Sequence, residues 1–135
     1  MPVILVDVNI EGHGAVIWGR LQSPQWNELT SLLTVTFASF REVGLDAASS
    51  DDLIWHSCQA SGFYLLTSNR NEDSSNSLEA TIRREGQPAS LPVFTIPSPD
   101  RVYHNPEFLE RVVDKLLNYL VDAENILGTG RLYLP

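Results

Sequence analysis

The central segment of the chain reads Phe63-Tyr64-Leu65-Leu66-Thr67-Ser68-Asn69-Arg70-Asn71-Glu72-Asp73, an apolar run that opens abruptly into polar side chains. Its first five residues carry no charge and are mostly aromatic or apolar, which is typical of a strand buried on both faces of a sheet. Amide, guanidinium and carboxylate groups follow where this strand ends. Because ligands of open parallel sheets bind at the carboxyl ends of the strands, the segment predicts a functional site at that edge.

The start of the chain repeats this pattern. The apolar stretch Val3-Ile4-Leu5-Val6 is followed closely by Asp7, Asn9 and Glu11. Two buried parallel strands deliver the polar groups at their carboxyl ends to one edge of the sheet. We therefore predict that Asp7 and Asn69 belong to a single pocket.

Helix signals separate the apolar runs. Ser23-Pro24, Ser50, Ser77 and Asn105-Pro106 each have the composition of a helix start, and Gly62 has that of a helix end. Strands separated by helices predict a central parallel sheet with helices on both faces, which is a three-layer α/β/α sandwich. The expected elements are strands near residues 3–8, 42–47, 63–68, 92–97 and 131–134, and helices near 50–61, 78–85 and 106–123.

Length and composition favour one globular domain over residues 1–135. The net charge of −8 and the pI near 4.7 remove the general electrostatic attraction to nucleic acid. Candidates for a local basic patch are Arg70, Arg83 and Arg84. One cysteine, Cys58, allows no internal disulfide, so we expect a cytoplasmic location. No apolar stretch reaches the roughly 20 residues of a membrane span, and we expect no membrane partner.

A third polar residue of the pocket comes from the helix that follows the second strand. Asp51 and Asp52 lie in its first turn, where adjacent side chains point about 100° apart. Asp51 shares its face with the apolar residues of this helix, which are Ile54, Trp55 and Cys58. We therefore predict that Asp51 faces the pocket, and that Asp52 forms a capping box with Ser49.

Three segments resemble motifs of the PIN-like domains, in the small branch related to the Mut7-C and DUF5615 families. They are Leu5–Ile10, Ala48–Ile54 and Tyr64–Glu72, and the resemblance covers residues 3–97 in the same order and spacing. It implies a three-layer α/β/α fold and, in active members, a ribonuclease that depends on Mg²⁺ or Mn²⁺ held by clustered carboxylates. It also implies an RNA substrate and a protein partner such as an antitoxin of a toxin–antitoxin pair. A homo-oligomer is a further expectation for this chain.

The chain departs from the family pattern after the third strand. The two aspartates expected there are Asn69 and Asn71, and an asparagine brings no charge and cannot serve as a base. Glu11, Asp73 and Glu79 are the candidates for a compensating acid. Carried over to this chain, the resemblance makes Asp7, Asp51 and Glu79 the metal ligands. It assigns catalytic roles to Asp7 and Asp51, with Asn69 and Asn71 positioning substrate or metal-bound water.

Each of these residues also has a purely structural interpretation. Asp7 is suited to capping a neighbouring loop, Asn69 and Asn71 are ordinary turn formers, and Cys58 fits a small core position. Two functions therefore stay open. One is a metal-dependent ribonuclease, and the other is a catalytically silent PIN-like protein that binds a partner or a nucleotide through the same pocket.

Overall fold

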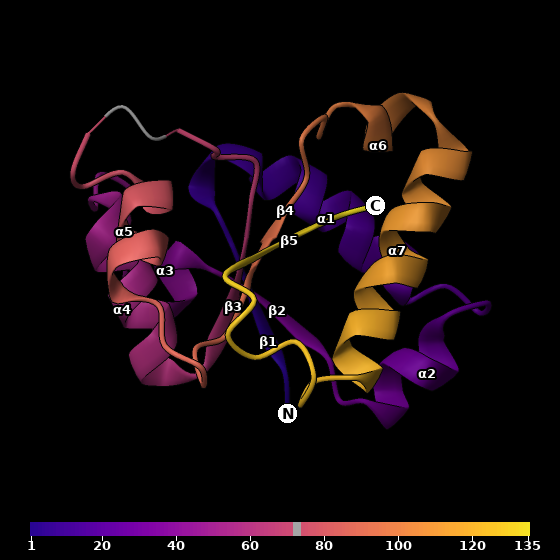
Figure 1. The fold of residues 1–135 in the computed structure, drawn as a ribbon. Helices are drawn as coiled ribbons and strands as arrows, with labels where there is room; N and C mark the ends of the chain where they lie inside the picture. The colour runs from indigo at the N-terminus through magenta and orange to yellow at the C-terminus, as the bar shows by residue number, and fades with distance from the viewer. Residues whose placement is uncertain (72–73) are drawn as a thin grey trace.

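The computed structural model describes residues 1–71 and 74–135, which fold around one all-parallel sheet (Figure 1). Within these residues the sheet has five strands in the order β2-β1-β3-β4-β5. The strands are β1 (Val3–Val6), β2 (Thr36–Ser39), β3 (Phe63–Thr67), β4 (Val93–Thr95) and β5 (Arg131–Tyr133). Helices cover both faces of the sheet, so the predicted α/β/α sandwich is confirmed.

The helices form two layers on opposite sides of the sheet (Figure 1). One layer contains α1 (Glu11–Leu21), α2 (Asn27–Leu32), α6 (Arg101–His104) and α7 (Pro106–Val121). The other contains α3 (Phe40–Val43), α4 (Asp51–Ser61) and α5 (Leu78–Glu85). None of the helices in the described residues is long and apolar enough to cross a membrane.

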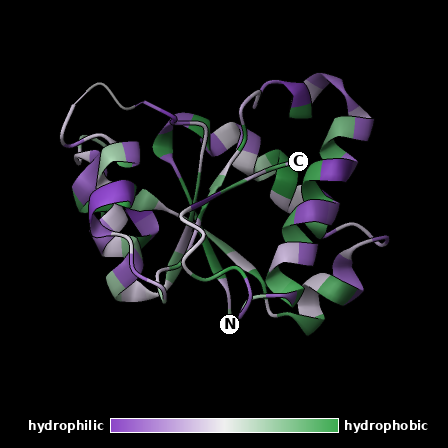
Figure 2. Ribbon diagram, in the orientation of Figure 1, coloured by the Kyte–Doolittle hydropathy of each residue, from purple (hydrophilic) through white to green (hydrophobic). Residues whose placement is uncertain are grey.

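Side chains that alternate along the strands fill two separate cores. Leu66 and Phe94 pack toward α1 and α7, whereas Leu65 and Val93 pack toward α4 and α5. In Figure 2 the strands and the sheet-facing side of α7 are mostly apolar. Because β3 is buried on both faces, its sequence had to be an uninterrupted apolar run.

The order of the strands places a topological switch point between β1 and β3. The chain passes from β1 to β2 on one side and later returns to β3 on the other side. β1 pairs with β3 in parallel from Val3 opposite Phe63 to Val6 opposite Leu66. The residues after these two strands therefore lie at the crevice where open parallel sheets bind ligands.

The crossover from β4 to β5 differs in hand from the other crossovers in the described residues. From β2 to β3 and on to β4, the chain moves toward one edge while its helices lie in the α4–α5 layer. From β4 to β5 it moves the same way, but its helices lie in the α1–α7 layer. When the helices change face but the chain keeps its direction across the sheet, the hand of the crossover reverses. About 98% of crossovers between parallel strands are right-handed. The last crossover is thus left-handed, and it places Arg131 beside Val93.

The predicted strand near residues 42–47 is wrong. The second strand is β2, and the chain turns at once into α3 because Ser39 and Glu42 form a capping box. The Ser39 hydroxyl accepts a hydrogen bond from the Glu42 N–H at 3.2 Å, and the Glu42 carboxylate accepts one from the Ser39 N–H at 3.1 Å. Gly44 ends α3 with φ of +80°, which favours glycine.

Two helix starts also differ from the sequence prediction. The helix expected at Ser23-Pro24 begins at Asn27, because the carbonyl of Ser23 forms a turn with the N–H groups of Trp26 and Asn27. The sequence also predicts a short helical piece over residues 15–21, but this helix, α1, begins earlier, at Glu11. At Gly14 a Cβ atom would lie 2.6 Å from Val6 Cγ1, so glycine lets α1 approach β1 closely.

Candidate functional site

Asp7 follows β1 and is anchored at both of its carboxylate oxygens. Oδ1 accepts a hydrogen bond from the Asn9 N–H at 3.1 Å and caps a short 3-10 turn, as the structural interpretation expected. Oδ2 accepts a hydrogen bond from the Thr67 hydroxyl at 2.6 Å, at the end of β3. The side chain is buried, with Asp7 only 8% exposed. Asp7 therefore ties the ends of the two central strands together.

Asn69 continues this chain of hydrogen bonds toward α4. Its backbone N–H donates to Thr67 Oγ1 at 3.0 Å, and its side-chain Nδ2 donates to Asp51 Oδ2 at 3.0 Å. Asp7, Asn69 and Asp51 are thus linked through Thr67 by three successive hydrogen bonds. The structure brings these three predicted residues together at one edge of the sheet.

Asp51, and not Asp52, faces this edge, as the helix-face argument predicted. Asp51 Oδ2 also accepts a hydrogen bond from the N–H of Leu78 at 3.1 Å, so the carboxylate lies at the positive N-terminus of α5. Asp52 is half-buried and accepts a hydrogen bond from the Ser50 hydroxyl, which lowers the pKa of the Asp52 carboxyl. The predicted capping box with Ser49 is wrong, because Ser50 is the residue that precedes the helix.

Arg131 completes the site, although sequence reasoning did not identify it. Its Nε donates to Glu79 Oε1 at 3.0 Å, and its Nη1 donates to the carbonyl of Asn69 at 2.8 Å and to Thr95 Oγ1 at 2.7 Å. The Arg131 side chain is only 7% exposed. The available signal was a charge opening a strand of a buried sheet, because such a charge needs partners. The sequence could not show which strand lay beside it.

Glu79 points toward the site, as expected for the acid at the start of α5. One of its oxygens pairs with Arg131, and the other pairs with Arg83 Nε at 3.0 Å. Its charge is therefore shared between two guanidinium groups. Glu79 holds an arginine at the site instead of standing free as a metal ligand.

Asn71 and the other candidate acids contribute differently. Asn71 is exposed, and its N–H donates to Asn69 Oδ1 at 2.9 Å, which is the turn geometry that the structural interpretation predicted. Glu11 begins α1 and lines a separate hollow with Trp18 and Phe37. Asp73 lies outside the described residues. Asn71 therefore bonds directly to the described network, whereas Glu11 lies in the separate hollow.

Cys58 packs in the core of the α4–α5 layer, as the sequence predicted. Burial raises the pKa of its thiol to about 12. Because the thiolate is the reactive form, this cysteine is not a nucleophile at neutral pH.

The Mg²⁺ or Mn²⁺ site that the resemblance implies stays a prediction, and the hydrogen bonds and ion pairs of its expected ligands are the following. The nitrogen of the Asn69 amide donates to Asp51, and its oxygen accepts one hydrogen bond from the Asn71 N–H, which leaves one lone pair on that oxygen. Glu79 is paired with two arginines. In the part of the chain that the structure describes, no three His, Cys, Asp or Glu side chains are grouped to hold a metal ion.

Comparison with known proteins adds no identification. No family model, curated protein or solved structure gives a significant match to this chain. The PIN-like resemblance therefore stays a prediction from three short motifs, whereas the parallel sheet and its edge are observed directly.

Proposed function

We propose that this chain is a PIN-like protein that binds a nucleotide at the edge between β1 and β3 and leaves it intact. The observation that carries this proposal is the set of internal hydrogen bonds on the acidic groups. Asp7 accepts a bond at each oxygen, and Asp51 Oδ2 accepts two. These bonds organise the carboxylates without a metal ion.

The position and charge of the edge support a ligand there. It lies at the topological switch point, where ligands of open parallel sheets bind. The three acids Asp7, Asp51 and Glu79 are matched in number by three arginines: Arg83 and Arg131, which pair with Glu79, and Arg70, which follows Asn69. A negatively charged ligand therefore meets no net repulsion from these six groups, in spite of the acidic chain as a whole.

The chemistry of the edge supports binding over cleavage. A general base must reach the proton that it removes, and Asp7 is buried with both oxygens engaged. The two asparagines cannot take up a proton. The acids of the edge therefore fix the positions of the surrounding groups.

The test measures uridine 5′-monophosphate binding by calorimetry, and cleavage of a fluorescent single-stranded RNA with saturating Mn²⁺. We expect binding and no cleavage, for wild type and for Asp7→Asn alike. Cleavage by wild type that is lost in Asp7→Asn would show that the proposal is wrong. Cleavage that persists in Asp7→Asn would belong to a contaminant, and a missing nucleotide signal would also defeat the proposal.

A second candidate is the metal-dependent ribonuclease, favoured by one observation. Asp51 Oδ1 accepts no hydrogen bond from the residues that the structure describes, so this oxygen is free to bind a cation. Mg²⁺ in proteins is commonly held by one or two carboxylates together with substrate phosphates. Under this function Mn²⁺ would raise the melting temperature of wild type, and Asp7→Asn would abolish the rise. An RNA substrate and an antitoxin partner stay predictions.

A further inference from the structure

One buried guanidinium nitrogen has no hydrogen-bond partner. Among the described residues, the buried side-chain nitrogen atoms without a partner are Arg131 Nη2 and His13 Nδ1. The His13 ring is already bonded through Nε2 to the Asp100 carboxylate at 2.6 Å, so that side chain has an anionic partner. Arg131 Nη2 instead carries two N–H groups on a permanent cation. Of the two atoms, Nη2 is the one that calls for an anionic partner.

The geometry of the guanidinium shows where Nη2 points. The group is planar, so the N–H bonds of Nη2 run parallel to those of Nε and Nη1 on either side. Nε points at Glu79 on α5, and Nη1 donates both to the carbonyl of Asn69 after β3 and to Thr95 Oγ1 on β4. Nη2 therefore lies between Glu79 on one side and the two acceptors of Nη1 on the other. Asp51 bonds to Asn69 and to the N–H of Leu78, the residue before Glu79, so Nη2 lies beside the site already described.

A second cation directly follows a residue of the same site in the chain. Arg70 directly follows Asn69, is exposed, and has no ion-pair or hydrogen-bond partner among the residues that the structure describes. Arg131 provides a fixed, desolvated donor, and Arg70 provides a free charge. Arginine forks of this kind suit phosphate oxygens, whose charge-assisted hydrogen bonds are stronger than neutral ones.

We propose that the site recognises its ligand by a phosphate group, which accepts hydrogen bonds from Arg131 Nη2 while Arg70 neutralises its outer oxygens. This inference rests on the proposed nucleotide-binding function and names the part of the nucleotide that is bound. Because Nη2 is closed off from solvent in this structure, phosphate binding includes a local shift of the side chains around it.

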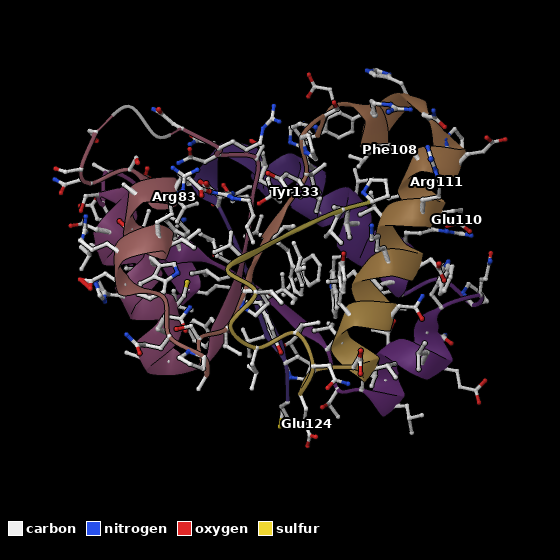
Figure 3. The ribbon with its side chains drawn as sticks, in the orientation of Figure 1. Arg83, Phe108, Glu110, Arg111, Glu124 and Tyr133 are labelled. Carbon is white, nitrogen blue, oxygen red and sulfur yellow. The ribbon has the colours of Figure 1, made fainter. Side chains whose placement is uncertain are left out.

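The experiment compares three probes by calorimetry at fixed ionic strength: uridine 5′-monophosphate, inorganic phosphate and uridine. We expect the two phosphate compounds to bind and uridine to give no signal. Arg131→Lys keeps the charge but removes the fork, and should weaken phosphate binding by about tenfold or more. Arg70→Gln should weaken it by severalfold with an unchanged melting temperature. Arg111→Gln, a surface arginine of α7 on the other face, is the matched control and should bind as wild type does (Figure 3).

The outcomes separate this inference from the function on which it rests. If uridine binds as tightly as its monophosphate, recognition by phosphate is wrong and nucleotide binding stands. If neither compound binds, both are wrong. If Arg131→Lys fails to fold, the Arg70→Gln result decides, because that side chain is exposed. A structure of phosphate-soaked protein with only an ordered water on Nη2 would also overturn the inference.

Discussion

Two arginine–glutamate pairs, one on each face of the sheet, are built differently. In the α1–α7 layer, Arg20 binds Glu110 through Nε and Nη2, both at 2.6 Å, with the side chains 31% and 34% exposed. In the α4–α5 layer, Arg131 binds Glu79 through Nε alone and is far more deeply buried. Figure 3 labels Glu110 on α7 and Arg83, the other partner of Glu79, on α5, on opposite sides of the sheet.

The difference indicates which pair only joins helices and which one also prepares a site. The exposed pair is complete, since Arg20 Nη2 also donates to Gln25 and the Trp26 indole donates to Glu110. The buried pair leaves Arg131 Nη2 without a partner. A buried donor without a partner lowers the stability of the fold more than an exposed one, because it has also lost its hydrogen bonds to water. A complete, solvent-screened pair fastens two helices together. An incomplete, buried pair bonded to the Asn69 turn is suited to a ligand.

The largest expected effect is the difference between the two pairs in what each contributes to the free energy of unfolding. Arg131→Met should lower the free energy of unfolding by about 2–4 kcal/mol, because Glu79, Thr95 and the Asn69 carbonyl all lose a buried donor. Arg20→Met should lower it far less, because the interaction of the Arg20–Glu110 pair is screened by solvent. Urea unfolding of both variants measures the difference. Equal losses would contradict the distinction between the two regions.

A smaller effect tests the edge without changing any charge. Thr67→Val removes the donor to Asp7 and the acceptor of the Asn69 N–H, and should cost about 2–3 kcal/mol. Thr30→Val is the matched control, since Thr30 is equally buried but donates only to the carbonyl of Trp26. It should cost about 1 kcal/mol. If Thr30→Val is the more damaging change in urea unfolding, Thr67 does not organise the edge.

Local sequence signals predicted most of the fold. The apolar run of β3, the Gly62 end of α4, and the Ser77 and Asn105 caps are contained in a few adjacent residues, and the structure confirms each of them. The second strand was misplaced because Thr36–Ser39 and the following residues both have mixed composition. The capping box of Ser39 and Glu42, rather than strand propensity, decides that boundary.

The candidate site was predictable only in its local part. Asp7, Asp51 and Asn69 were found because strand ends and helix faces follow from the periodicity of their own segments. Arg131 was missed because it lies 62 residues from its partner Asn69. Its position also depends on a left-handed crossover, which contradicts the usual rule for parallel sheets. No pattern near residue 131 encodes that neighbour.

The smallest expected effect is a pH dependence confined to the exposed pair. The hydrogen bonds from Arg20 lower the pKa of Glu110 below its ordinary value. A group with a lowered folded-state pKa contributes stability above its unfolded pKa, and loses that contribution as pH falls through the folded value. The contribution of Glu110 should therefore be complete at pH 6–8 and decline below about pH 4.5. Because the pair is a third exposed, we expect about 1 kcal/mol at most.

Unfolding in urea between pH 3.5 and pH 7 measures this contribution as the difference in free energy between wild type and Glu110→Gln. The difference should shrink as pH falls, because the glutamine neither ionises nor attracts Arg20. Arg20→Gln should reproduce the same convergence with wild type, since it removes the donor that lowers the Glu110 pKa. A constant difference across this range would mean that the pair acts through packing and neutral hydrogen bonds. The contrast between the Arg20–Glu110 pair and the Arg131–Glu79 pair would then rest on their burial alone.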